Sequence, residues 1–292
     1  MPDKRIRLTM LNVMGGAEFP SALDTHVQWG VGLLDLKDCI FGKGIADLDG
    51  RELHDAKRLI DQRGLQTYCL SSVLFVGEVE QGEEFFTREY LGRLPRLIEI
   101  ATVLRPRFIR LLAAQTARRG DFTDSTDYLR RSHPWVFDVY GRAIDLIHAA
   151  GFEATIENET HRCIWARPAE IVSFFNELAR PQAVKLTWDI QNLWQCGTFP
   201  SLDVYRQLRP LIAFIHVKGG QGETPGGPLK WSSSLEDASW PVAEIIKEVA
   251  ADGVSPVICL NPSHGSPRPG VDYSNVFKGD IDFLRLAIPE IE

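Results

Sequence analysis

Cysteine is scarce in this sequence and irregularly spaced. The chain of 292 residues has five cysteines, and no two of them form a CxxC pair. An odd, scattered set excludes a disulfide-stapled fold, which needs paired cysteines, and a thiolate zinc site, which needs closely spaced ones. We therefore expect reduced thiols and a cytoplasmic protein.

Long apolar runs and an excess of positive charge are also missing. No stretch reaches the roughly 18 uninterrupted apolar residues of a membrane span, and the opening "MPDKRIRLTMLNVMGG" has too short an apolar run for a signal peptide. The formal net charge is -7, whereas binding a nucleic-acid backbone needs a basic surface. We expect a small-molecule ligand, with neither nucleic acid nor membrane as a partner.

The glycine fingerprint of dinucleotide binding is absent too. The first strand-to-helix turn, "NVMGGAEF", has no GxGxxG motif, which disfavours a doubly wound sheet. What is present is a repeat of short runs rich in Val, Ile, Leu and Thr, each followed by helical periodicity. The predicted strands are Ile6 to Val13, Val31 to Asp38, Leu65 to Ser72, Arg107 to Ala114, Phe152 to Glu159, Ala183 to Ile190, Ile212 to Gly219 and Pro256 to Ser263.

Glycines that stop predicted helices directly before strands indicate a parallel sheet. Gly64, Gly151 and Gly253 each end an amphipathic segment in this way. Eight strand and helix pairs in one chain predict a single (β/α)8 TIM barrel over residues 1–292, an α/β fold. The longest strand-to-helix connections would then lie on the C-terminal rim, where barrel active sites form: Val73 to Phe85, Gln115 to Pro134 and Gly219 to Ser239.

Polar side chains follow the last four predicted strands. Glu157 ends the fifth, Asp189 the sixth and Asn261 the eighth, while His216 and Lys218 lie on the seventh. Residues at these ends converge in a barrel, and mixed oxygen and nitrogen donors predict a divalent metal ion: Mn, Mg, Co, Fe or Zn. Taken singly, His216 could be a core histidine and Asp189 a helix N-cap.

The chain resembles the xylose isomerase-like TIM-barrel superfamily of sugar phosphate isomerases and epimerases. The resemblance covers nearly the whole length and is carried by "IENE", "WDIQN", "HVKG" and "SWPVAEIIKEVAADGVSPVICLNP". It implies a metal held by Glu157, Asp189, His216 and a last carboxylate, whose position is taken here by Asn261. It also implies a carbohydrate substrate and is compatible with a homo-oligomer.

The asparagine at position 261 changes the chemistry that the resemblance implies. An amide can coordinate a metal but cannot take up and return a proton, so an epimerase with two carboxylate bases is disfavoured. We predict a one-base site in which Glu157 removes a proton alpha to a carbonyl, as a sugar isomerase does. The acid that completes the reaction would be His161, Lys218 or His264.

Three further residues are candidate substrate contacts. Lys37 could bind an anion or form a salt bridge, Asn192 replaces the histidine of ketose epimerases, and Trp188 could stack on a sugar or pack in the core. The same site would suit a lyase or dehydratase acting by β-elimination. A catalytically degenerate sugar-binding barrel is the remaining alternative, and the acidic charge disfavours the nuclease branch of the superfamily.

Overall fold

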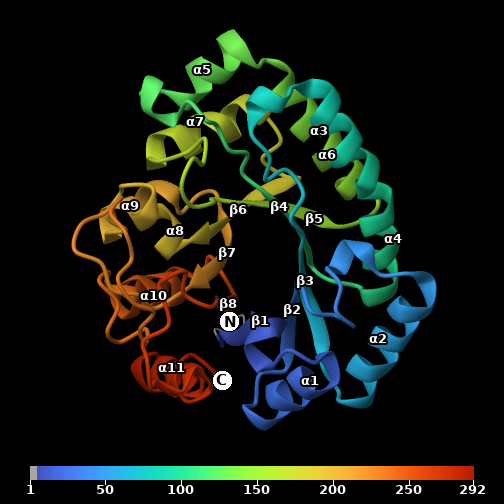
Figure 1. Ribbon diagram of the computed structural model, residues 1–292, viewed down its shortest axis with the longest axis vertical. Coiled ribbons are helices and arrows are strands. Elements are labelled where there is room, and N and C mark those ends of the chain that lie inside the picture. The colour runs from blue at the N-terminus through green and yellow to red at the C-terminus, as the bar shows by residue number, and fades with distance from the viewer. Residues whose placement is uncertain (1–4) are drawn as a thin grey trace.

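The computed structural model describes residues 5–292, and its strands form a closed parallel barrel (Figure 1). Each strand pairs with the next along the chain, and the last closes on the first. The strands are β1 (Arg7–Leu11), β2 (Leu33–Leu36), β3 (Gln66–Ser71), β4 (Phe108–Leu112), β5 (Glu153–Glu157), β6 (Val184–Asp189), β7 (Ile212–Val217) and β8 (Val257–Leu260).

Helices surround the barrel on the outside (Figure 1). The α-helices are α1 (Phe19–Gln28), α2 (Gly50–Gln62), α3 (Glu83–Glu89), α4 (Leu94–Leu104), α5 (Ser125–Ser132), α6 (Trp135–Ala149), α7 (Pro168–Leu178), α8 (Ile190–Gln195), α9 (Leu202–Leu208), α10 (Val242–Asp252) and α11 (Tyr273–Ala287). Short 3-10 helices are η1 (Asn12–Gly15), η2 (Ile45–Asp47), η3 (Val79–Gln81), η4 (Leu91–Arg93) and η5 (Arg119–Asp121). Within residues 5–292, no helix is long and apolar enough to cross a membrane.

The predicted barrel is confirmed, with every strand shorter than the apolar run that predicted it. The three glycine joints are also confirmed. Gly64, Gly151 and Gly253 follow α2, α6 and α10 with φ of 66°, 86° and 67°, the left-handed conformation in which a side chain would be strained.

The connections at the carboxyl ends of the strands differ in structure. The segment 73–85 contains η3, and 115–134 contains η5 and α5, whereas 219–239 contains no helix or strand. That last connection is held by an isolated bridge between Gln221 and Trp231. Together these segments border the mouth of the barrel, where side chains at the strand ends meet.

The first and last segments of the described chain are hydrogen-bonded to each other. The backbone N–H of Ile6 donates to the oxygen of Glu290, and that of Glu292 donates to the oxygen of Ile6. α11 is thereby tied next to β1, which completes the ring of helices.

The interior of the barrel has an apolar floor. Seven buried residues, separate from the core between strands and helices, form this layer: Leu33, Tyr68, Cys69, Phe108, Phe214, Val257 and Cys259. Alternate residues of a strand face the same side. Positions two residues further along several of these strands therefore also point inward, at the level of the mouth.

Candidate active site at the barrel mouth

The polar residues of the mouth lie two positions beyond residues of the floor. Arg110 follows Phe108 on β4, and His216 follows Phe214 on β7, with their rings 4.9 Å apart in the second case. Asn261 follows Cys259 in the same manner. The strand period thus places ionisable and amide side chains directly above an aromatic layer.

Asp189 joins a strand to a helix and serves both. It ends β6 and caps α8, where its Oδ1 accepts from the backbone N–H of Asn192 at 2.9 Å. Its backbone is fixed from the other side, because Asn158 donates to its carbonyl oxygen and accepts from its N–H, each at 2.9 Å. The alternative interpretation of Asp189 as an N-cap is confirmed for Oδ1, while Oδ2 lies toward Lys218 in the mouth.

Glu157, Asp189 and His216 converge as the sequence predicted. Each offers a ligand atom, and these atoms lie within 4.8 Å of one another. All three side chains are almost fully buried. Asn261 joins them, with its Nδ2 placed 2.8 Å from His216 Nδ1.

A buried guanidinium pairs with the predicted base. Arg110 Nη1 donates to Glu157 Oε2, and Arg110 Nη2 donates to the backbone oxygen of Ser72 at 2.9 Å. Glu157 Oε1 lies 3.0 Å from His216 Nδ1. Burial would raise the pKa of Glu157, but Arg110 and His216 outweigh burial and lower it well below its usual range. Glu157 is therefore ionised at neutral pH.

His216 lies between two carboxylates. Its Nδ1 faces Glu157, and its Nε2 lies 3.4 Å from Asp35 Oδ2, close enough for an ion pair but without hydrogen-bond geometry. Burial favours the neutral ring, yet the two carboxylates outweigh it and raise the pKa of His216 to about 9. Below Asp35, the thiol of Cys259 donates to Oδ2 at 3.4 Å.

Lys218 is the second buried cation of the mouth. Its Nζ lies 2.8 Å from Asp189 Oδ2, again without hydrogen-bond direction at the carboxylate. It donates to Asn192 Oδ1 at 3.0 Å and lies 3.1 Å from His264 Nε2. Burial raises the pKa of Asp189 despite this neighbour.

The hydrogen bonds around His264 define which groups carry protons. The Lys218 ammonium can only donate, so His264 Nε2 accepts and the neutral ring carries its proton on Nδ1, which lies 2.9 Å from Gln195 Oε1. His264 Nε2 then accepts from Lys218, whose charge lowers the pKa of His264 to about 3. Gln195 Nε2 lies 3.3 Å from His161 Nε2, which connects His161, another predicted proton donor, to the same series of hydrogen bonds.

The three predicted substrate contacts lie in different environments. Asn192 is buried in the mouth and bonded to Lys218. Lys37 is half-buried, with its Nζ 3.6 Å from Asp38 Oδ2. Trp188 is fully buried and stacks on Tyr205 of α9, on the side of β6 opposite to Asp189. Its placement is that of a packing residue, so Trp188 has no part in the site described below.

The donor set is suited to a divalent metal ion in its atom types and spacing. Carboxylate oxygens and an imidazole nitrogen from three strands lie within 4.8 Å of one another, which suits the ligands of one ion in their chemical types. A 180° flip of the Asn261 side-chain amide would exchange its oxygen and nitrogen, which have nearly the same shape, and would add an amide oxygen to the donor set. Arg110 pairs with Glu157, and Lys218 pairs with Asp189. The site is therefore less negative than it would be if both carboxylates were unpaired.

Two important residues were absent from the predicted set. Gln195 contacts both histidines, and Asp35 Oδ2 lies 3.4 Å from His216 Nε2. Asp35 interrupts the apolar run "VGLLDL", and this interruption was the available signal. Gln195 has no comparable signal in the sequence. It is the last residue of the short helix α8, which is positioned by its N-cap, Asp189.

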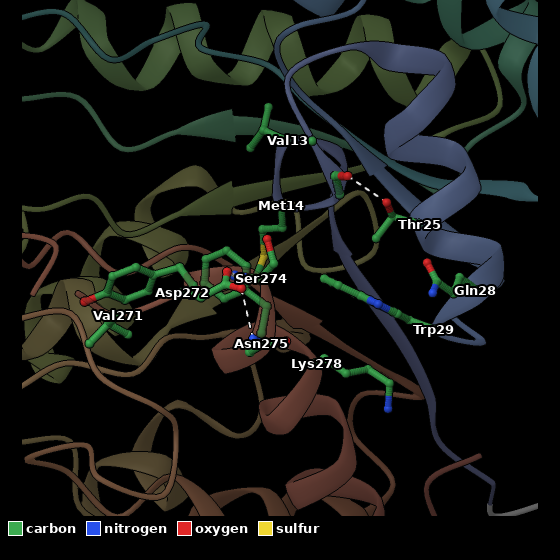
Figure 2. Close-up of a pocket in the computed structure, with 14 residues that line it drawn as sticks. Val13, Met14, Thr25, Gln28, Trp29, Val271, Asp272, Ser274, Asn275 and Lys278 are labelled. Carbon is green, nitrogen blue, oxygen red and sulfur yellow. Dashed lines mark hydrogen bonds between the residues drawn. The ribbon is translucent and has the colours of Figure 1, made fainter. Parts of the chain in front are cut away.

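A separate cavity of about 800 Å³ lies in the outer ring of helices (Figure 2). It is lined by the β1–α1 connection, α1 and the start of α11. Among its polar groups, Thr25 donates to the oxygen of Gly15, and Asn275 donates to Asp272, the N-cap of α11. None of the predicted site residues lines it.

The comparisons with known proteins agree with the fold. The family model described as "Xylose isomerase-like TIM barrel" matches residues 30–285. No curated protein matches the chain. Many solved structures do, and those described next share too little identity to show more than the fold.

Three of these structures illustrate the range of chemistry on this architecture. The probable 3-DHS dehydratase AsbF of Bacillus anthracis is 14% identical, with a TM-score of 0.71, over 96% of this chain and 98% of that one. A xylose isomerase-like protein of Mycobacterium smegmatis in complex with magnesium is 15% identical, with a TM-score of 0.70, over 98% of both. A D-psicose 3-epimerase in the presence of D-fructose is 13% identical, with a TM-score of 0.71, over 97% and 99%.

Proposed function

Because the chain belongs to the xylose isomerase-like TIM-barrel family, we propose that it is a metal-dependent sugar isomerase with Glu157 as its base. Its substrate would be a small sugar or a polyol-derived ketone, from which Glu157 removes a proton alpha to the carbonyl. The observation that carries the proposal is the convergence of Glu157, Asp189 and His216 from three successive strand ends.

Glu157 has the protonation state that a base requires. Arg110 and His216 keep it ionised, so it can accept a proton at neutral pH. The same contacts make it a weak base, because a carboxylate with a lowered pKa holds a proton poorly. The carbon acid must therefore be activated by positive charge near its carbonyl oxygen.

A divalent ion would supply this activation. Glu157, Asp189 and His216 would hold it, with Asn261 as a fourth, neutral ligand. When bound, such an ion acts as a Lewis acid that stabilises negative charge on an oxygen next to the reacting carbon. The magnesium complex of the Mycobacterium smegmatis protein supports the proposal by analogy of fold.

Lys218 is the group best placed to return a proton. It carries donors toward Asn192 and His264, whereas His264 is held as an acceptor on the side that faces Lys218. This pattern favours Lys218 over His264 as the acid, with His161 and His264 positioned through Gln195. Asn261 cannot exchange protons, so an inversion that needs two opposed carboxylates is disfavoured.

β-Elimination is the second candidate. Lys218 directly follows β7, whereas Glu157 ends β5, an arrangement that allows one group to remove a proton while the other assists a leaving oxygen. A lyase or dehydratase would use the same residues, and the dehydratase among the structural neighbours supports it by analogy of fold.

Proton exchange in heavy water tests the proposal. The protein with Mn²⁺ is incubated with a panel of ketoses and keto-polyols, and deuterium incorporation and product formation are followed by NMR. We expect exchange in at least one substrate and a loss of about 10²- to 10⁴-fold in Glu157→Gln. Glu159→Gln is the matched control, because Glu159 is the neighbouring carboxylate outside the proposed ligand set.

The products separate the alternatives. A rearranged ketose or aldose supports the isomerase, and loss of water or of an alcohol supports the lyase. Sugar binding without exchange, with equal behaviour of the Glu157→Gln variant, would contradict both and leave a degenerate sugar-binding barrel.

A further inference from the structure

Each buried carboxylate of the mouth lies against a basic side chain. Three carboxylates, Asp35, Glu157 and Asp189, are each in contact with a cationic group. Arg110 pairs with Glu157, His216 lies between Glu157 and Asp35, and Lys218 pairs with Asp189. A site built only to receive a divalent ion would leave negative charge unpaired, because the ion itself supplies the compensation.

The ion pairs Arg110–Glu157 and Lys218–Asp189 differ in geometry. Arg110 holds Glu157 with a directed hydrogen bond and is anchored to the backbone of Ser72. Lys218 approaches Asp189 Oδ2 at 2.8 Å without hydrogen-bond direction, and its directed bond goes to Asn192 Oδ1. Lysine is also a flexible point charge, whereas the guanidinium is a rigid fork. Asp189 is therefore the carboxylate whose partner can be exchanged.

We propose that Lys218 is an internal competitor for the divalent ion at Asp189. In the metal-free site its ammonium neutralises Asp189; when the ion binds, Asp189 becomes its ligand and the ammonium is released toward Asn192, His264 and the substrate. The proposal rests on the proposed function, since it assumes that the ion binds at this site. It also implies that Lys218 is free to donate a proton to the substrate only when the ion is bound.

Lys218→Met tests the competition by removing the charge and keeping an unbranched side chain. Calorimetric titration with Mn²⁺ at constant pH should show binding at least about tenfold tighter than in the parent chain, since a like charge has been taken from beside a ligand. Lys218→Arg keeps the charge and should not tighten binding. Circular dichroism verifies that each variant is folded.

Lys37→Met is the matched control. It also removes one lysine charge near the mouth, but Lys37 is half-buried and faces Asp38 rather than a ligand. We expect a change of less than about threefold, because solvent screens the more distant charge. Equal tightening in the Lys37 and Lys218 variants would overturn the proposal, since it would reduce the effect to net charge.

Asn261→Glu separates failure of this inference from failure of the proposed function. It adds the carboxylate that the family usually has at this position and should tighten Mn²⁺ binding. If Asn261→Glu binds more tightly while Lys218→Met binds as the parent or more weakly, the competition is wrong and the metal site stands. If no variant binds Mn²⁺, the competition and the metal site are both wrong.

Discussion

The floor and the mouth of the barrel are built on the same strands but held together by different forces. Phe214 and His216 are two residues apart on β7, and so are Phe108 and Arg110 on β4. The floor side chains stabilise the fold by burying apolar area. The mouth side chains are charged, and burying them is costly unless each is paired with a group of opposite charge. Stability should therefore reside in the floor and chemistry in the mouth, and each expectation can be tested by substitution.

The largest effect is expected in the floor. Phe214 is fully buried, with its ring 5.2 Å from Tyr68 and 6.0 Å from Phe108. Phe214→Ala should lower the free energy of unfolding by about 3–5 kcal/mol, because it leaves a cavity among rigid rings. Urea unfolding measures the loss, with Leu286→Ala, at a side chain 86% exposed, as a control that changes little. A loss below about 1 kcal/mol would contradict the expectation that the floor contributes most to stability.

The second effect concerns the buried ion pair of the mouth. Arg110→Met removes the guanidinium from Glu157, leaves only His216 beside this buried carboxylate, and should cost about 3 kcal/mol of unfolding free energy. The double variant Arg110→Met with Glu157→Leu turns this part of the mouth into an apolar pair and should be more stable than Arg110→Met alone. Arg180→Met, which breaks an exposed pair with Asp145, should cost less than about 1 kcal/mol. Additive losses in the double variant would disprove the coupling.

A carboxylate without a cation provides the contrast to Glu157. Asp280 on α11 is buried, accepts from the N–H of Leu235 at 2.7 Å, and has its pKa raised to about 7 by burial. The stability linked to this raised pKa is present below the unfolded value of 3.8 and is lost as the pH rises through about 7.

Asp280→Asn should therefore be more stable than the parent by about 3–4 kcal/mol at pH 8 and show no gain near pH 4. Urea unfolding at the two pH values measures the difference, and Asp282→Asn, at an exposed carboxylate paired with Lys278, is the control. A gain of the same size at both pH values would show that titration of Asp280 is not the cause.

The smallest effect is a pH dependence of metal affinity. His216 has its pKa raised to about 9, so at neutral pH it must lose a proton before it can act as a ligand. Mn²⁺ affinity should rise about tenfold per pH unit between pH 6.5 and 8, with release of one proton. Calorimetry in buffers of different ionisation enthalpy counts the protons. An affinity independent of pH in this range would show that His216 is not a ligand in its deprotonated form.

The sequence was a good guide wherever one strand's own pattern decided the outcome. The barrel, the glycine joints and the identity of Glu157, Asp189 and His216 as inward-facing strand-end residues all follow from local periodicity. Trp188 is the instructive contrast, because its neighbour Asp189 faces the mouth and the strand period must then turn Trp188 toward α9.

The partners of the charged groups could not be read from the chain. Arg110 and Glu157 are 47 residues apart, and Lys218 and His264 are 46 apart, so no local pattern links them. The sequence left His161, Lys218 and His264 as candidate proton donors, and the contact between Lys218 and His264 Nε2 favours Lys218.

Local sequence thus settles which side chains reach the mouth, since strand period and strand order depend on short-range pattern and chirality. Closure of the barrel settles how those side chains are charged, since pKa values depend on burial and on neighbours from distant strands. Asn261 belongs to both levels: the chain supplies an amide in place of a carboxylate, and the fold places it 2.8 Å from the histidine of the site.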